Sequence, residues 1–374
     1  MSRFHIIGYV DPLVVSAGAQ LAVKVSCKEA TYSSKVLRLG PAVDHPDAPP
    51  VGHRVIEAIP QGIHKGRLQF SRPGSYARIN SWNGSSLRDA DSLSIKFWCQ
   101  ATLPGDAGHE QFLFSSFDDG LSNGFACLLD EASNLCIRVG GSAEIQETKF
   151  VAKLVRYQWY NMQITIDCLA RKVKLKAQAK GKDIGESSVS LEEEHGLPES
   201  PKLASDEPLI IASDSRDCRP SSFPVKSGSF NGKIDGFKLE AISAGRTNVL
   251  LDFDFSILMT TDEIRDISKN HCHGELVHAP ARAVTSYDWD ASQNNWTCAS
   301  YGYGALHFHD DDLDDAAWET SFELRLPTEL KSGCYGVLVD DGKSTDIIPF
   351  LVRPSSNASN VPPVAVIMPT HIYW

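Results

Sequence analysis

The sequence predicts a mainly β protein in which an immunoglobulin-like sandwich is split by an inserted sandwich of jelly-roll type. Short apolar runs that alternate with polar residues occur along most of the chain, whereas helical periodicity is nearly absent. The 27 glycines and 20 prolines favour turns over long helices. The strand runs at each end are too few to enclose a core alone, so together they indicate one sandwich interrupted by another.

Residues 1–75 are predicted to form the first part of the immunoglobulin-like sandwich. Alternating runs over 4–10, 20–27 and 34–39 indicate antiparallel strands with one buried face. A proline-rich connector follows at 40–52 and leaves this sandwich incomplete.

Residues 76–256 are predicted to form the inserted jelly-roll sandwich. The expected strands cover residues 92–101, 111–117, 124–130, 134–139, 157–167, 172–179, 208–212, 228–239 and 250–255. So many short strands bury their apolar faces only when two sheets stack on each other. The polar stretch 181–206 lacks apolar periodicity and is interpreted as a solvated excursion.

Residues 257–354 are predicted to hold one short helix and the second part of the immunoglobulin-like sandwich. Within 259–270, Ile264 and Ile267 have helical spacing and Thr261 is placed as an N-cap. The expected strands after this helix cover residues 318–326, 333–339 and 346–352. Together with the opening strands they complete one sandwich.

Residues 355–374 are predicted to be a linker and the first strand of an incomplete α/β domain. The run 364–368 is continuously apolar, as in a strand that helices cover on both faces. A single parallel strand is not stable without neighbours. We therefore expect a domain that is truncated here, in preference to a tail that completes a sheet of a partner.

Composition and charge exclude several functional classes. The 36 basic and 47 acidic residues give 36 − 47 = −11, which disfavours nucleic acid as a partner. The first residues do not have the pattern of a secretory signal, and no apolar stretch is long enough for a membrane span. A soluble protein with no membrane partner is expected. Nine scattered cysteines without a Cys-x-x-Cys pair favour reduced thiols and a cytoplasmic location.

The densest group of polar side chains lies shortly before the second set of strands. It consists of His307, His309, Asp310, Asp311 and Asp312. In a strand the two histidines would share one face, and the carboxylates could add oxygen ligands for a metal. Two histidines alone make an incomplete site, and acidic runs at loop corners are usually solvated or capping. We therefore predict a structural or interdomain hydrogen-bonding role for this group.

Two further groups contain residue types that can bind metals. The first, which matches no ordinary zinc spacing, consists of His271, Cys272, His273 and His278. The second contains carboxylates of the kind that bind calcium in lectin sandwiches, namely Asp118, Asp119, Asp252 and Asp254. Asp252 and Asp254 are equally consistent with the exposed face of a strand. Whether the sandwich binds calcium or a glycan stays open.

The Gly-x-Gly-x-x-Gly pattern of a phosphate-binding loop is absent. One Gly-x-Ser-x-Gly match, at 120–124, lies between two predicted strands, whereas the elbow of a catalytic nucleophile joins a strand to a helix. Two sandwiches without such a signature favour a scaffold or binding role, with no catalytic residue in this chain. Tyr373 is the exception, because it follows the predicted strand 364–368 at its carboxyl end, where α/β sheets place their ligands. A core or gate role and a site role both fit this position.

Several motifs resemble the large (beta) subunit of N,N-dimethylformamidase and its relatives. The more specific blocks lie at 303–313, 332–335, 348–354 and 369–373. Weaker matches, in part shared with laminin-G-like domains, lie at 8–9, 74–76, 230–236 and 251–253. The resemblance spans nearly the whole chain and implies a laminin-G/concanavalin-A-like fold for the inserted sandwich.

The resemblance also implies an amide hydrolase whose iron is held by two tyrosines and one glutamate, in a C-terminal domain similar to glutamine amidotransferases. Tyr373 matches the position of the first tyrosine ligand. The other ligands would lie beyond Trp374, so no iron is expected on this chain alone. In the complete enzyme the iron would act as a Lewis acid on the amide. A small helical subunit accompanies the large one in the family, and an oligomer is expected.

Two functions from different classes follow. The favoured one is the non-catalytic N-terminal region of an amidohydrolase that converts a small N-substituted amide to carboxylate and amine. Its sandwiches would act as a scaffold and as a subunit-contact module, and the chain alone would be inactive. The alternative is a free-standing carbohydrate-binding, lectin-like sandwich. Glycan binding that disappears with EDTA would reveal it.

Overall fold

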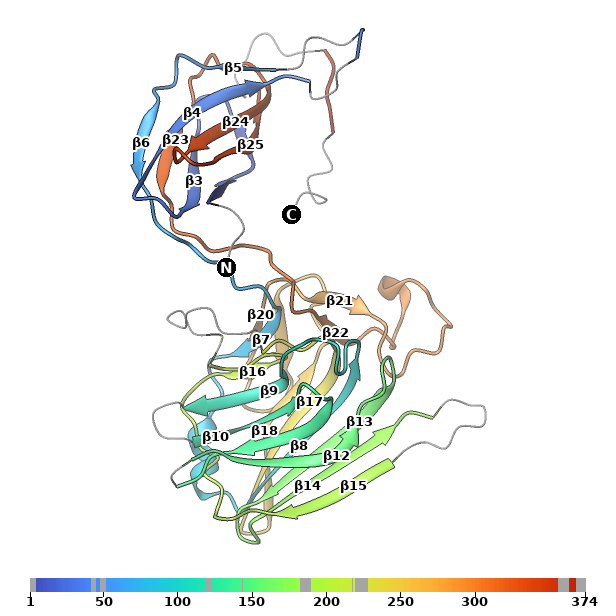
Figure 1. Cartoon of the computed structure of the whole chain (residues 1–374). Helices are drawn as coiled ribbons and strands as arrows, with labels where there is room; N and C mark the ends of the chain where they lie inside the picture. Colours follow the sequence, from blue (N-terminus) through green and yellow to red (C-terminus); the bar gives the residue numbers. More distant parts are fainter. Residues whose placement is uncertain are drawn as a thin grey trace. The chain divides into compact units, whose positions relative to one another are not determined.

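The chain folds into two compact units, and nearly all of the regular secondary structure that is described in them consists of β-strands (Figure 1). The computed structural model describes residues 5–41, 45–47, 52–118, 123–142, 144–181, 190–216, 218, 228–355 and 363–367. Unit 1 comprises Met1–Ser71 with Ala316–Trp374, and unit 2 comprises Arg72–Asp315. The prediction of a mainly β protein is confirmed.

Unit 1 is a β-sandwich whose strands come from both flanks of unit 2 in the sequence. One sheet, in the order β1-β3-β23, consists of β1 (Ile6–Asp11), β3 (Gln20–Cys27) and β23 (Phe322–Arg325). The other has the order β2-β25-β24-β4-β5, with β6 beside β4. Its strands are β2 (Val14–Ser16), β4 (Thr31–Leu39), β5 (His53–Val55), β6 (Gly62–Lys65), β24 (Gly333–Asp340) and β25 (Thr345–Arg353). Inward residues such as Val23, Tyr335 and Phe350 share one core, so the two sets of strands stabilise each other.

Unit 2 is one large antiparallel sheet that folds over its own core. The strand order is β12-β11-β10-β9-β16-β7-β20-β19-β18-β17-β8-β13-β14-β15, with β22 beside β17 and β21 beside β22. At opposite ends of this order, the Val151 amide of β12 donates a 3.4 Å hydrogen bond to the Glu193 carboxylate of β15. The sheet is therefore nearly closed, and residues such as Phe97, Phe114 and Phe237 fill its interior.

The elements of unit 2 follow one another closely along the chain. The strands are β7 (Tyr76–Ile79), β8 (Ser92–Ala101), β9 (Gln111–Asp118), β10 (Asn123–Leu129), β11 (Asn134–Val139), β12 (Gln146–Lys153), β13 (Trp159–Asp167), β14 (Lys172–Ala179), β15 (Ser190–Gly196), β16 (Leu209–Ile211), β17 (Gly232–Ser243), β18 (Arg246–Asp254), β19 (Glu263–Asp266), β20 (Gly274–Val277), β21 (Ala281–Val284) and β22 (Ala305–Phe308). Two short 3₁₀ helices, η1 (Gly84–Asp89) and η2 (Trp296–Cys298), lie between them.

The helix predicted over 259–270 is not formed, and this prediction is wrong. The segment consists of turns and the short strand β19, which pairs with β18 and β20. The Arg282 guanidinium donates to five backbone carbonyls in and before this segment, and a helix would need two of them, of Thr261 and Glu263, for its own hydrogen bonds. The five carbonyls belong to Phe255, Ile257, Leu258, Thr261 and Glu263, at 2.6 to 3.0 Å.

Two other segments differ from their predicted assignment. Residues 257–315 were expected with the second part of the outer sandwich, yet they belong to unit 2, because β19 to β22 pair with β7, β17 and β18. Within the expected excursion 181–206, residues 190–196 form β15. Lysines on β14 compensate its acidic side chains, with Lys172 at 2.6 Å from Glu194. Because this charge pairing runs between strands, single-strand periodicity did not reveal it.

The strand predicted at 364–368 is also not observed where the structure describes it. Residues 364–367 have no strand assignment and are exposed, with Ile367 at 94%. A strand requires neighbours to pair with its backbone groups, and none among the described residues pairs with this run. Met368 and Tyr373 lie outside the described residues. That this run opens an α/β domain stays a prediction.

Candidate functional site

The two histidines of the predicted polar group lie beside each other on β22 and just after it. His307 is paired with Lys233 of β17, and its neighbours Leu306 and Phe308 point into the core of unit 2. The His307 and His309 rings have centroids 4.0 Å apart, with their planes at 53°. Both imidazoles therefore face away from the core.

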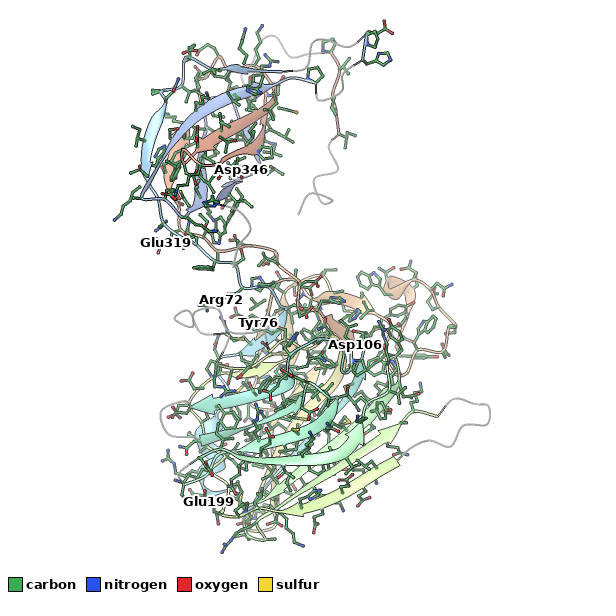
Figure 2. The ribbon with its side chains drawn as sticks, viewed as in Figure 1. Arg72, Tyr76, Asp106, Glu199, Glu319 and Asp346 are labelled. Atoms are coloured by element: carbon green, nitrogen blue, oxygen red, sulfur yellow. The ribbon has the colours of Figure 1, made fainter. Side chains whose placement is uncertain are left out.

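His309 belongs to a network that joins the acidic turn, residues 309–315, to Ser75. Ser75 precedes Tyr76 at the start of β7 (Figure 2). The Asp312 Oδ2 atom lies 3.1 Å from His309 Nδ1 and accepts a 2.7 Å hydrogen bond from Ser75 Oγ. The Ser75 amide donates to the His309 carbonyl at 3.0 Å, and the Gly74 amide donates to the Asp312 carbonyl at 2.8 Å. These contacts fasten the turn to the beginning of β7.

The charges in this network stabilise each other. Hydrogen bonding to Asp312 raises the pKa of His309. Burial opposes ionisation of Asp312, but the hydrogen bonds from His309 and Ser75 outweigh it and lower the pKa of this carboxyl. The contact therefore favours the charged forms of both side chains.

This arrangement is not a catalytic triad, although it contains Ser, His and Asp. In a triad the histidine accepts the serine proton and the aspartate orients the histidine from its other side. Here Ser75 and His309 both bind the same oxygen of Asp312, so His309 is not placed to deprotonate Ser75. The Ser75 side chain is also fully buried, out of reach of a substrate.

His307 is in a different electrostatic state from His309. Burial lowers its pKa to about 4, and the neighbouring His309 and Lys233 charges act in the same direction. Its Nε2 atom is buried and has no hydrogen-bond partner among the described residues. Lys233 Nζ donates instead to the carbonyl and hydroxyl oxygens of Thr285, each at 3.0 Å. At neutral pH His307 is an uncharged imidazole.

The three aspartates of the predicted group do not converge. The Asp310 amide donates to Asn231 Oδ1 at 3.2 Å, and its carboxylate lies 3.9 Å from His109 Nε2. Asp311 is exposed, and only Asp312 contacts a histidine of the group. The contacts are consistent with the structural role predicted for this group, which stays a prediction.

The remaining described candidates for metal ligands lie apart from one another in local contacts, and Asp119 lies outside the described residues. The His273 ring contacts Arg265 and the Asp266 amide, and His278 Nδ1 lies 2.9 Å from Asp314. Asp252 pairs with Lys238 at 3.1 Å, and Asp254 accepts hydrogen bonds from Ser256. Across the described ranges, no three His, Cys, Asp or Glu side chains are arranged to hold a metal ion. These residues do not fit the implied iron, and the structure does not describe Tyr373.

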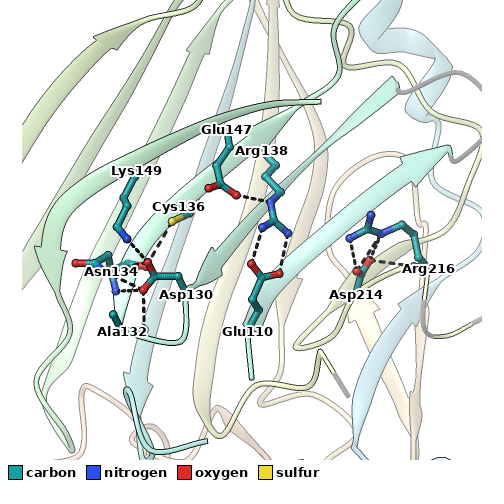
Figure 3. A network of polar contacts seen from close by, with 10 residues as sticks. All are labelled: Glu110, Asp130, Ala132, Asn134, Cys136, Arg138, Glu147, Lys149, Asp214 and Arg216. Atoms are coloured by element: carbon teal, nitrogen blue, oxygen red, sulfur yellow. Dashed lines mark hydrogen bonds and ion pairs between the residues drawn. The ribbon is translucent and has the colours of Figure 1, made fainter. Parts of the chain in front are cut away.

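A charged network on β11 and β12 is likewise engaged internally (Figure 3). Arg138 forms two hydrogen bonds with Glu110, at 2.6 and 2.9 Å, and a third with Glu147 at 2.6 Å. Asp130 accepts from Asn134 and contacts Lys149, which brings the pKa of its carboxyl to about 2 despite partial burial. Because each charge has a partner within the network, we interpret it as a stabilising feature of the sheet.

Sequence reasoning missed the segment between β21 and β22, which we call the aromatic loop, residues 285–304. Its first residues are fastened to the outer face of the sheet: Thr285 to Lys233, and Ser286 to Asp235. Tyr287 stacks on Trp98, with ring centroids 4.1 Å apart and planes at 4°. The signal was present in the composition, because five of these twenty residues are Trp or Tyr and none is Lys or Arg.

The part of the chain that the structure describes also contains no helix that is long and apolar enough to cross a membrane.

Fold and site together define a mainly β protein of two units, in which Ser75, His309 and Asp312 do not form a catalytic triad. Residues 281–374 match the family described as N,N-dimethylformamidase beta subunit-like, C-terminal. The chain is 27% identical to the N,N-dimethylformamidase beta subunit of Paracoccus aminophilus, over 95% of this chain and 50% of that protein. It is 24% identical to the beta subunit from Alcaligenes sp, over 100% and 52%. These matches confirm the predicted resemblance to the N,N-dimethylformamidase beta subunit-like family.

The chain spans about half the length of the curated relatives it matches. Among solved structures it is similar to mouse laminin alpha1 domains LG4-5, with a TM-score of 0.32 and 12% identity over 53% of this chain and 48% of that chain. It is also similar to the SAP-like pentraxin of Limulus polyphemus, with a TM-score of 0.31 and 9% identity over 57% and 79%. Both likenesses are remote.

Proposed function

We propose that this chain is the non-catalytic N-terminal region of an N,N-dimethylformamidase-like amidohydrolase, in which its two units act as a scaffold and a subunit-contact module. The main support is similarity to two beta subunits over 95% and 100% of the chain, although the chain spans only about half their length. The residues that carry out catalysis would then belong to the other half of a longer protein. The complete protein would hydrolyse a small N-substituted amide.

The geometry of the acidic turn supports this proposal. Ser75, His309 and Asp312 come together in the predicted group, and the Asp312 oxygen that Ser75 and His309 share gives them a structural arrangement. Their role would be to hold β7 and β22 together at the entrance and exit of unit 2.

The finer fold assignment belongs to the same proposal. Unit 1 would be an immunoglobulin-like sandwich, which its two sheets and the parallel pairing of β2 with β25 support. Unit 2 would be a laminin-G/concanavalin-A-like sandwich inserted into it as a separate folding domain. Support comes from the separate hydrophobic cores of the two units.

Cofactor, partners and location are part of the proposal too. The complete protein would hold iron with Tyr373 as one ligand, and would assemble with a small helical subunit into an oligomer. A cytoplasmic location is supported by the nine cysteines, all of which are free thiols.

The experiment compares this chain with the complete protein that contains it. Both are purified, and iron content and dimethylformamide hydrolysis are measured. We expect iron and activity in the complete protein only, and a tyrosinate-to-iron absorption band that Tyr373→Phe removes or weakens. Activity of the short chain would overturn the proposal. Tight glycan binding that EDTA abolishes, with no amide hydrolysis by the complete protein, would favour the lectin-like alternative.

A further inference from the structure

The aromatic loop is held rigidly at its base. Thr285, Ser286 and Tyr287 each contact a different side chain of the sheet beneath, as described above. Further along, Trp289 Nε1 and Tyr303 OH both donate to the Gln293 carbonyl, at 3.3 and 2.8 Å. A surface that is already ordered before binding loses little conformational entropy when a partner arrives.

Despite this order, the loop leaves large aromatic side chains in solvent. Trp289 is 38% exposed and Tyr301 is 52% exposed. Burying such rings in the core would stabilise the fold, yet the loop turns them outward. Exposed, rigid Trp and Tyr side chains are the residues that dominate the energetics of protein interfaces.

The charge of the loop is negative and is not compensated within it. Asp288 has no hydrogen-bond or ion-pair partner among the described residues, and the loop contains no Lys or Arg. Asp290 accepts hydrogen bonds from the Ser292 amide and the Tyr301 hydroxyl, and these bring the pKa of its carboxyl to about 2. The Asp290 carboxylate is therefore charged at neutral pH, and Asp288 adds a second carboxylate that has no described partner.

One cation of the chain already uses this surface. Lys180, at the end of β14, places its ammonium 6.0 Å from the centre of the Tyr287 ring and donates to the Tyr287 carbonyl. The contact combines a ring face with an oxygen acceptor, which is the recognition pattern of ammonium and guanidinium groups.

We propose that the aromatic loop is a docking surface for a basic segment of a partner polypeptide. Trp289 and Tyr301 would stack on its Arg or Lys side chains, while Asp288 and Asp290 pair with their charges. The inference rests on the proposed function, because it names a surface through which the scaffold makes a subunit contact.

Two observations favour a basic polypeptide over a sugar. Two neutral groups that could recognise hydroxyls are already used inside the loop: Gln293 Oε1 accepts from the Asn295 amide, and Asn295 Oδ1 accepts from Thr297. Beside neutral side chains such as Asn294, the exposed surface of the loop carries negative charge and aromatic rings. The open position of both rings favours an extended segment with several contacts over one small cation, which a single ring face holds weakly.

The test is isothermal titration calorimetry of the 374-residue chain with a hexa-arginine peptide at low and high salt. We expect Trp289→Ala to weaken binding about tenfold, as for an aromatic anchor of an interface. Asp288→Asn, which breaks no described contact, should weaken it about threefold. The matched controls are Glu323→Gln, which removes the same charge from an exposed site in unit 1, and Tyr157→Ala, which removes another exposed ring. Both should stay within about twofold of the unchanged chain.

Several outcomes would overturn the proposal. Absence of peptide binding, or equal losses in Asp288→Asn and Glu323→Gln, would show that only net charge attracts the peptide. Binding to a printed glycan array that Trp289→Ala abolishes would assign the surface to a saccharide instead. The titration uses the chain alone, so its failure leaves the amide-hydrolysis test of the complete protein unaffected, and the reverse also holds.

Discussion

The acidic turn and the aromatic loop are joined by β22 and use their polar groups in opposite ways. In the turn, Asp312 contacts both Ser75 and His309, so its charge is paired with groups of the fold itself. In the loop, Asp288 has no described partner and Trp289 remains exposed. The comparison teaches that a dense run of reactive side chains in a sequence identifies a site only when those side chains are left without partners.

The largest expected effect is on the turn. Asp312→Ala removes the acceptor shared by Ser75 and His309 and leaves the proton of the buried Ser75 hydroxyl only a long 3.5 Å contact with the His309 carbonyl, which should lower the free energy of unfolding by about 3 kcal/mol. Urea unfolding at neutral pH measures this. The exposed neighbour provides the control, since Asp311→Ala should change stability by less than about 0.5 kcal/mol. Loss of stoichiometric metal from the Asp312→Ala protein would contradict the structural interpretation.

A smaller effect is the pH dependence of stability, which should differ between His307 and His309. The folded-state pKa of His307 is about 4, below its ordinary value, so its stabilising contribution is present above pH of about 6.5 and is lost as pH falls towards 4. After allowance for partial exposure we expect a loss of about 2 kcal/mol across this window. His307→Gln should flatten that part of the stability profile.

For His309 we expect the opposite dependence of stability on pH. Because Asp312 raises its pKa, the contribution of His309 is complete at low pH and is lost as pH rises through the raised value. His309→Gln should therefore leave the loss below pH of about 6.5 in place and remove a loss on the alkaline side. If both variants changed the profile in the same direction, the assignment of charge states would be wrong.

The next effect on stability is expected at Asp235, which contacts the base of the aromatic loop. Burial raises the pKa of Asp235 to about 6, although Ser286 and the Gly236 amide donate to it, so the folded state holds a proton more tightly than the unfolded state. Stability then falls as pH rises from about 4 to about 6. Asp235→Asn should raise the free energy of unfolding by about 1.5 kcal/mol at pH of about 8 and have little effect at pH of about 4, as thermal unfolding at both values would show. A lower stability at both values would mean that the Ser286 contact matters more than the buried charge.

The smallest effect is expected at the exposed end of the loop. Tyr301→Phe removes the hydroxyl that donates to Asp290 but keeps the ring, so stability should change by no more than about 0.3 kcal/mol. Chemical denaturation measures it. A loss comparable to that of Asp312→Ala would show that the loop, like the turn, uses its polar groups to hold the fold.

Much of the strand content followed from local pattern, while some elements did not. The alternation of Leu21, Val23 and Val25 predicted a half-buried strand, and β3 has these residues in the core. The spacing of Ile264 and Ile267 predicted a helix, but Ile264 lies in a strand because Arg282 binds the carbonyls around it. That arginine comes after the segment it reorganises, so no window on the segment itself contained the information.

The sequence by itself determined the class of fold and the position of most strands, because period-two burial is a local property of the backbone. It also placed His307 and His309 on one side of the chain. Only the tertiary structure decided which of the polar groups are satisfied. Ser75 and Asp312 are 237 residues apart in sequence, yet they form a 2.7 Å hydrogen bond. The partners that neutralise a charge or leave it free come from distant strands, and their arrangement depends on the pairing of the whole sheet.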